Sequence, residues 1–181
     1  MTSSGIGKII FSQEQIQKRV AEVGREITRD YKERDLVIVS VLKGSLYFVA
    51  DLTRSIDLPL EVDFLSIGLS PEAASKAGAV RFTKDLDIDI KGRDVLLAED
   101  VIGTGLTLGY ICQHLEAARP ASLKICTLLD NPAERLLTIN IDYRCFVMPD
   151  TFLIGYGLDY HEKYRNLPYI AEFVRDRTGK P

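Results

Sequence analysis

The feature that most constrains the fold is a series of short apolar runs, each followed by a turn and a helical pattern. Leu36–Leu42 is apolar and rich in β-branched residues, and residues 94–99 and 122–129 repeat this character. Strands that are apolar on both faces are typical of a parallel sheet covered by helices. The alternation of these strands with helices therefore predicts an α/β fold with a parallel sheet core flanked by helices.

The remaining elements are predicted from periodicity and end signals. Ser12 and Gln15 form a capping-box pattern ahead of a helix, in which Ile16, Val20 and Ile27 recur at helical spacing. Residues 68–79 are small, lack periodicity and predict a long mobile loop, and the tail from residue 175 is expected to fray. Further helices are expected at residues 45–55 and 104–118, and further strands at residues 60–67, 80–83, 144–148 and 152–156.

The bulk composition bounds the class of protein. The chain has 181 residues, 46% of them hydrophobic, which suits a single domain over residues 1–181. The net charge of −3 lacks the basic footprint of a nucleic-acid binder, so nucleic acid is not an expected partner. Without a membrane-length apolar run or signal peptide, we expect a cytoplasmic protein with no membrane partner. Cys112, Cys126 and Cys145 match no metal or redox spacing and are expected in the core.

A strand, turn and helix over residues 95–107 carry the most specific chemistry. The turn contains Gly103, Thr104 and Gly105 and is followed by Thr107. The N–H groups and dipole at a helix start favour a phosphate, glycines let it approach the backbone, and threonine hydroxyls donate to its oxygens. The lysine of a Walker A loop and the third glycine of a dinucleotide fingerprint are both missing.

Two adjacent carboxylates, Glu99 and Asp100, end the strand before this turn. They are unsuited to phosphate, but suit ribose hydroxyls or a divalent cation held through water. The alternative interpretation is a helix cap beside two solvated acids. Ligands of open α/β sheets bind at this edge, which favours the binding interpretation.

The segment Val-Leu-Leu-Ala-Glu-Asp-Val-Ile-Gly-Thr-Gly-Leu-Thr resembles the phosphoribosyl-pyrophosphate (PRPP) signature of the type I phosphoribosyltransferases. From residue 16 to residue 170 the chain is similar to bacterial hypoxanthine phosphoribosyltransferases. The resemblance implies a parallel sheet with a small hood and transfer of the 5-phosphoribosyl group from PRPP to a purine base. It also implies Mg²⁺ as cofactor and a homodimer or homotetramer.

The resemblance also implies roles for individual residues. Asp159 would bind the metal, with Glu99 and Asp100 nearby. Phe152 would stack on the base, and the Leu153 backbone and Asn131 would meet its edge. In this family the peptide after the lysine of the pyrophosphate loop, Lys43-Gly44 here, is often cis. The expected PRPP-binding residues are Lys43, Gly44, Glu99, Asp100, Gly103, Thr104, Gly105, Leu106, Thr107 and Arg165.

Three positions depart from the family pattern. Gly103 stands where the family has the aspartate that acts as general acid or base near purine N7, and glycine cannot transfer a proton. Asn131 replaces the lysine that reads the 6-oxo group, and Leu69-Ser70 replaces the Ser-Tyr of the mobile lid. His161, beside the expected metal ligand, is an alternative proton donor.

These departures leave three functions open. The first is a purine phosphoribosyltransferase with weak activity. The second is a catalytically impaired sensor of PRPP or a nucleotide, and the third is a transferase for a different base. Residues 84–87 resemble the segment after the family's flexible loop, with a solvated turn as the alternative.

Overall fold

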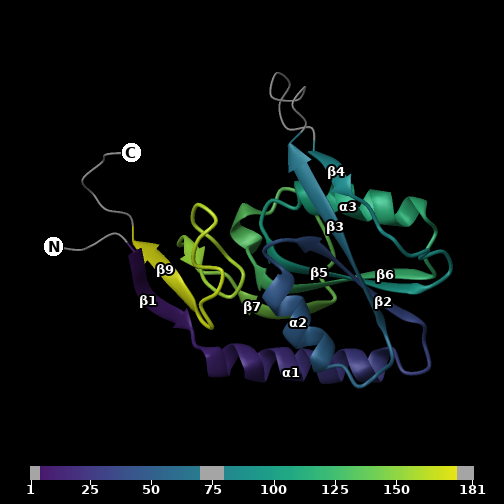
Figure 1. Ribbon diagram of the computed structural model, residues 1–181, viewed down its shortest axis with the longest axis horizontal. Coiled ribbons are helices and arrows are strands. Elements are labelled where there is room, and N and C mark those ends of the chain that lie inside the picture. The colour runs from purple at the N-terminus through teal and green to yellow at the C-terminus, as the bar shows by residue number, and fades with distance from the viewer. Residues whose placement is uncertain (1–4, 70–79, 175–181) are drawn as a thin grey trace.

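The computed structural model describes residues 5–69 and 80–174 (Figure 1). Its main sheet has six strands in the order β4-β3-β2-β5-β6-β7. Five strands pair in parallel, namely β3, β2, β5, β6 and β7. Strand β4 joins the edge antiparallel to β3. The strands of this sheet are β2 (Leu36–Leu42), β3 (Glu61–Leu69), β4 (Val80–Lys84), β5 (Asp94–Ile102), β6 (Ser122–Asp130) and β7 (Tyr143–Val147).

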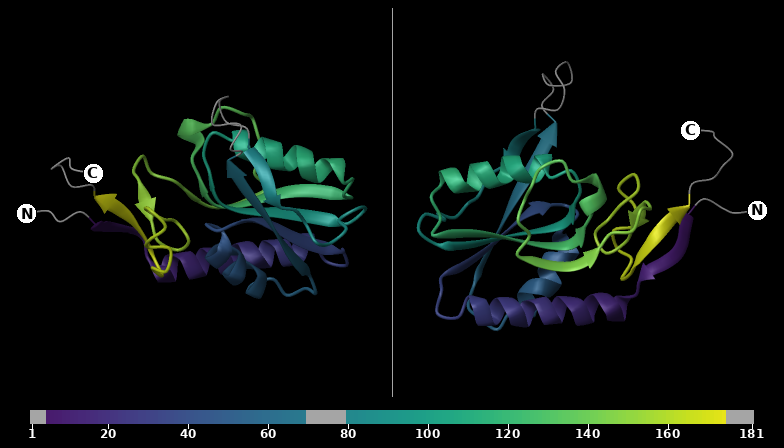
Figure 2. Two further views of the ribbon diagram at one scale, coloured as in Figure 1. Left: turned by 45° about the horizontal axis from the view of Figure 1, so that its top comes forward. Right: turned by 180° about the vertical axis from the view of Figure 1, so that it is seen from behind.

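Helices cover both faces of this sheet, as the doubly apolar strands predicted. Helices α1 (Gln13–Asp30) and α2 (Leu46–Arg54) lie on one face, and α3 (Leu106–Ala117) lies on the other (Figure 2). Successive residues of a strand point to opposite faces. Ile38 of β2 therefore joins the core under α1 and α2, whereas Val37 joins the core under α3.

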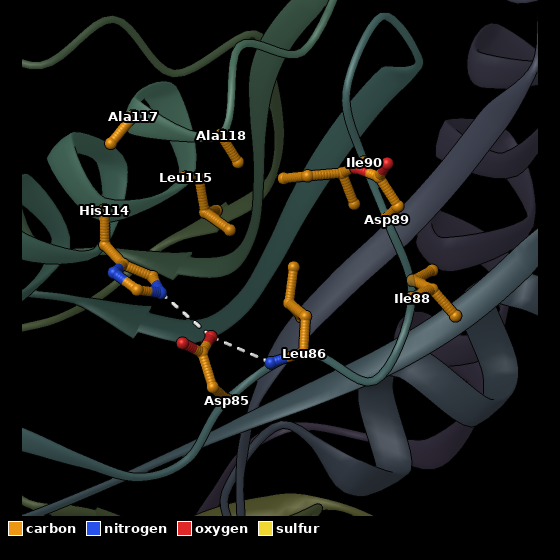
Figure 3. A pocket seen from close by; sticks show the side chains of 9 residues that line it. All are labelled: Asp85, Leu86, Ile88, Asp89, Ile90, His114, Leu115, Ala117 and Ala118. Atoms are coloured by element: carbon orange, nitrogen blue, oxygen red, sulfur yellow. Dashed lines mark hydrogen bonds and ion pairs between the residues drawn. The ribbon is translucent and has the colours of Figure 1, made fainter.

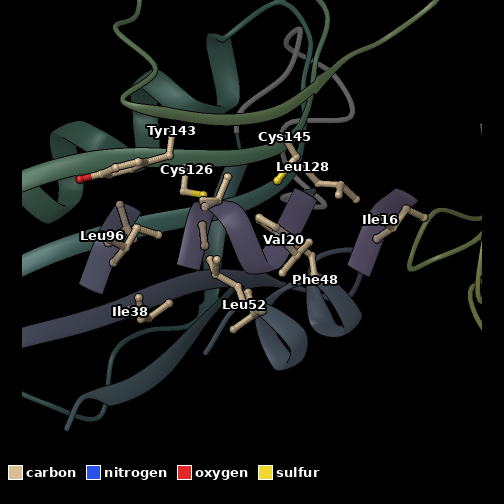
Figure 4. Packing of buried hydrophobic residues seen from close by; sticks show 14 of the residues in the cluster. Ile16, Val20, Ile38, Phe48, Leu52, Leu96, Cys126, Leu128, Tyr143 and Cys145 are labelled. Carbon is tan, nitrogen blue, oxygen red and sulfur yellow. The ribbon is translucent and has the colours of Figure 1, made fainter. Parts of the chain in front are cut away.

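The larger core is formed between α1, α2 and the sheet (Figure 4). Ile16 and Val20 of α1 meet Phe48 and Leu52 of α2. The capping box of α1 is present, with Gln15 N donating to Ser12 Oγ at 3.2 Å. The expectation for the cysteines is confirmed for two of them. Cys126 and Cys145 are buried in this core, and Cys112 is half-buried against the core under α3.

A second, three-stranded antiparallel sheet forms the small hood at one end of the molecule (Figure 1). Its order is β1 (Gly5–Phe11), β9 (Ile170–Val174) and β8 (Leu153–Ile154). The sequence predicted the hood only by resemblance and did not predict β1 or β9. Both strands are partly exposed and lack a continuous apolar run, and they form by pairing the two ends of the chain. The predicted strand 152–156 was too long, because only two of its residues pair with β9.

Two predicted features lie in parts of the chain that the structure does not describe. Residues 70–79 of the expected mobile loop, including the lid position Ser70, and the tail from residue 175 lie outside the described residues. Strand β3 continues through Gly68 and Leu69, where the loop was expected to begin. Over the described ranges, no helix is long and apolar enough to cross a membrane.

Candidate functional site

The turn after β5 ends at Gly105, which is the N-cap residue of α3. Gly105 has φ of +83°, in the left-handed region where glycine has no Cβ penalty. A Cβ at this position would also lie 2.9 Å from Cδ1 of Ile139. The helix predicted from residue 104 therefore begins at Leu106, because Gly105 is not helical. The first N–H groups of α3 have no partner within the helix and mark its N-terminus as the predicted phosphate site.

The segment after β6 covers this turn and holds its backbone. Leu136 N donates to the carbonyl of Thr104 at 2.9 Å, and Arg135 Nε donates to the carbonyl of Gly103 at 2.9 Å. Arg135 also forms an ion pair with the buried Asp130. The sequence did not single out Arg135, because only the return of the chain over the turn reveals its role.

The two adjacent carboxylates of β5 face different neighbours. Glu99 lines a cavity of about 70 Å³ between the sheet and α3, together with Thr107 and Ile111. Its Oε1 is buried and finds no hydrogen-bond partner in residues 5–69 and 80–174. Burial, and then the charge of Asp100, raise the pKa of Glu99 well above its ordinary value. A ligand or water that donates to Glu99 would compensate for this burial.

Asp100 lies on the opposite side, against the loop after β2. A Cβ on Gly44 would overlap Oδ2 of Asp100, so only glycine fits there. Burial raises the pKa of Asp100, although its hydrogen bond from Val101 N and the charge of Arg165 lower it in part. The alternation of side chains along a strand explains why neighbouring carboxylates separate in this way.

The pyrophosphate loop predicted at Lys43 and Gly44 contacts a second glycine from far along the chain. A Cβ on Gly157 would overlap the carbonyl oxygen of Gly44, and Gly157 has φ of +102°. The cis peptide is present, but it joins Leu42 to Lys43. The predicted position, between Lys43 and Gly44, was therefore wrong by one residue, because resemblance located the loop but not the individual bond.

An ion-pair network closes this side of the site. Arg165 Nη2 lies 2.9 Å from Oδ1 of Asp159 and 3.3 Å from Oε1 of Glu162. Lys43 Nζ lies 3.0 Å from Oε2 of Glu162. The hydrogen bond from Lys43 is the largest cause of the lowered pKa of Glu162. The sequence did not identify Glu162, whose carboxylate engages both cations predicted to bind pyrophosphate.

The three expected metal ligands do not converge on one point. Over the described ranges, no group of three or more His, Cys, Asp or Glu side chains is placed to hold a metal ion. Asp159 and Asp100 are close enough that the charge of Asp159 contributes to the raised pKa of Asp100. Glu99 is separated from them because it faces the cavity under α3.

The residues predicted to meet the base come from two parts of the fold. Asn131 follows β6, is buried, and donates its backbone N–H to the carbonyl of Ile102 at 3.0 Å. Phe152 precedes β8 in the hood and is 43% exposed, so its ring is accessible for stacking. Leu153 is buried in β8, which leaves its backbone as the predicted contact. His161 packs its ring edge-on against Tyr160, with centroids 4.2 Å apart.

A separate hollow lies beside α3 and the segment after β4 (Figure 3). His114 Nε2 lies 2.8 Å from Oδ1 of Asp85, and its ring stacks on Phe82 with centroids 4.1 Å apart. Residues 84–87 also wrap the buried Asp63, which accepts from Asp87 N at 2.6 Å and Lys84 Nζ at 3.3 Å. These contacts hold the segment against the sheet, so it is more than a solvated turn.

Comparison with known proteins identifies relatives of nearly the whole chain. Residues 8–161 match the family of phosphoribosyl transferase domains. The chain is 45% identical to a hypoxanthine-guanine phosphoribosyltransferase of Bacillus subtilis, covering 94% of this chain and 95% of that protein. It is 45% identical to one of Mycobacterium avium, covering 92% and 85%. A crystal structure of a Bacillus anthracis hypoxanthine-guanine phosphoribosyltransferase superposes with a TM-score of 0.88 at 41% identity, covering 93% and 99%.

Proposed function

Since the chain belongs to the phosphoribosyl transferase domain family, we infer that it is a purine-salvage phosphoribosyltransferase. It moves the 5-phosphoribosyl group from PRPP to a purine base of the hypoxanthine or guanine type. The observation that carries this function is the meeting of three distant segments. Gly44 contacts Asp100 and Gly157, and Arg165 donates to the carbonyl of Gly157 at 2.7 Å.

The phosphate-binding half of the reaction follows from this arrangement. The 5-phosphate would bind the N–H groups at the start of α3 and the hydroxyls of Thr104 and Thr107. Arg165 and Lys43 would receive pyrophosphate, which requires Glu162 to yield its contacts with both. These groups position the anomeric carbon and stabilise the departing charge, and such positioning accounts for much of the rate in transfer reactions.

The remaining contacts to PRPP and the metal are proposed on chemical grounds. Asp159 would bind Mg²⁺, with Asp100 beside it and the other positions taken by pyrophosphate oxygens and water. This fits the desolvated carboxylate of Asp100, whose pKa is raised and which a cation would stabilise. Magnesium would neutralise charge on the leaving pyrophosphate. Glu99, which faces the cavity, is assigned to the ribose side.

The base would be held by the second half of the site. Phe152 would stack on one face of the heterocycle, and the Leu153 backbone would bind its edge. Asn131 both donates and accepts, so it is compatible with a 6-oxo or a 6-amino group.

The domain organisation, location and assembly of the enzyme are proposed from its resemblance to the family. We expect one catalytic domain over residues 1–181, acting in the cytoplasm as a homodimer or homotetramer. Fractionation of cells and light scattering of the purified protein test location and assembly respectively.

The test of the function is pyrophosphate release from PRPP and magnesium, with hypoxanthine, guanine, xanthine and adenine supplied separately. Release with hypoxanthine or guanine supports the proposal. Release with adenine alone would instead indicate a transferase respecified at Asn131.

A sensor of PRPP is the second candidate, favoured by Gly103 and by the carboxylate of Glu162 between Lys43 and Arg165. Saturable PRPP binding without turnover of any base would support it over the enzyme.

A further inference from the structure

We propose that the carboxylate of Glu134 replaces the missing side chain of residue 103 as the group that exchanges a proton with the purine base. This inference rests on the proposed function. Among the described residues, Glu134 is the carboxylate that lies against Gly103: a Cβ added there would be 3.2 Å from Oε2 of Glu134. The carboxylate of an aspartate begins one bond beyond its Cβ, so Glu134 occupies the space that such a group would need.

Local structure holds Glu134 in this position. It is the last residue of the 3-10 helix η2 (Pro132–Glu134), which begins directly after Asn131. On one side, Asn131 N donates to the carbonyl of Ile102. On the other side, Arg135 donates to the carbonyls of Gly103 and Ile102, at 2.9 and 3.1 Å. The segment that carries Glu134 is thus tied to the turn through the backbone of Asn131 and the side chain of Arg135.

The Glu134 carboxylate is free to contact a bound ligand. It is exposed, and the described residues offer its carboxylate no hydrogen bond or ion pair. The neighbouring cation, Arg135, is directed to backbone carbonyls and to Asp130 instead. His161, the alternative proton donor, packs its ring against Tyr160 on the segment that carries Asp159.

The proton balance of the step is simple. The base enters neutral, as the tautomer that carries a proton on N7 and a lone pair on N9. The N9 lone pair forms the bond to the anomeric carbon, while the bond from that carbon to pyrophosphate breaks and pyrophosphate keeps the electron pair. The N7 proton passes to Glu134, and the protonated carboxyl group later releases it to water. In the reverse direction Glu134 donates the proton.

The decisive variants are Glu134→Gln and the double variant Gly103→Asp with Glu134→Ala, in which the shorter residue 134 leaves room for the new carboxylate. Glutamine keeps the shape of the side chain but cannot accept the proton. Gly103 is not among the glycines with positive φ, so aspartate fits its backbone. Glu116→Gln, at an exposed glutamate of α3, is the matched control.

We expect Glu134→Gln to lower kcat for hypoxanthine about 100-fold, with KM for PRPP within about twofold of the original. The double variant should recover at least about tenfold of this loss, because it restores a carboxylate at the same place. Glu116→Gln should change neither constant. Thermal unfolding of each variant verifies that it is folded.

Two results would overturn the inference: a Glu134→Gln variant with unchanged kcat, or a loss of kcat that Gly103→Asp does not recover in a folded double variant. Failure of the proposed function has a different signature, because the unaltered protein would then release no pyrophosphate with any base.

Discussion

The proposed pyrophosphate side and the proposed base side of the site differ in how they are built. The proposed pyrophosphate side depends on close backbone contacts. Gly44 lies against Gly157 and Asp100, and neither glycine has space for a Cβ. On the base side, exposed side chains such as Phe152 and Glu134 project from short segments. The residues proposed to bind pyrophosphate follow the family pattern, whereas the departures at positions 103 and 131 change side chains that are proposed to face the base. A site made from close backbone contacts tolerates little change, whereas projecting side chains can be exchanged without altering the fold.

The largest effect is expected from Gly157→Ala, which breaks the backbone contact. The new Cβ would overlap the carbonyl oxygen of Gly44 at a φ of +102°. We expect a loss of about 3 kcal/mol in the free energy of unfolding, measured by urea denaturation. PRPP binding, measured by calorimetry, should fall below detection.

Gly92→Ala is the matched control for this change. Gly92 has φ of +72°, but nothing lies within 4 Å of its added Cβ. It should cost about 1 kcal/mol from backbone strain alone and leave PRPP binding intact. Equal losses in both variants would contradict the importance of the contact between Gly157 and Gly44.

Arg165→Lys should have the next largest effect, again on the pyrophosphate side. Lysine keeps the charge but cannot bind bidentately, and it loses the bond to the carbonyl of Gly157. A loss of about 2 kcal/mol predicts a rise in KM for PRPP of about 30-fold. Steady-state kinetics measures it, with the exposed Arg29→Lys as control. An unchanged KM would remove Arg165 from the pyrophosphate site.

Asn131→Lys tests the base side alone. It introduces the cation that the resemblance places near the 6-oxo group, so kcat/KM for hypoxanthine should rise about tenfold relative to adenine. KM for PRPP should stay within about twofold, because the two halves are separate. Asn140→Lys, at an exposed asparagine, is the control. Equal changes for both bases would contradict a role of residue 131 in base selection.

The smallest effect is expected from Glu162→Gln. This change removes the carboxylate that competes with pyrophosphate for Lys43 and Arg165. Freed from the carboxylate, Lys43 and Arg165 should bind PRPP about threefold more tightly. Because Lys43 lowers the pKa of Glu162, the carboxylate stays charged as pH falls until that lowered pKa is reached. The gain over the unaltered protein should therefore be constant from about pH 6 to about pH 9. Fluorescence titration of PRPP binding at each pH measures this gain. A gain that varies across this range would contradict competition between Glu162 and pyrophosphate.

The elements that could be predicted from the sequence are those with strong local signals. The strand over Leu36–Leu42 and the capping box at Ser12 were confirmed, because hydrophobic period and cap chemistry are properties of neighbouring residues. The turn at residues 103–105 was also recognisable. Strand β9, by contrast, was missed, since Ile170–Val174 becomes a strand only by pairing with the other end of the chain.

Thus the sequence by itself determined the α/β class, the strands of the parallel sheet and the position of the phosphate turn. Only the tertiary structure decided which neighbours Glu99 and Asp100 each face and that Glu134 lies against Gly103. The physical reason is the range of the interactions. Periodicity and capping act over a few residues, whereas contacts between segments depend on how the chain crosses and returns over itself.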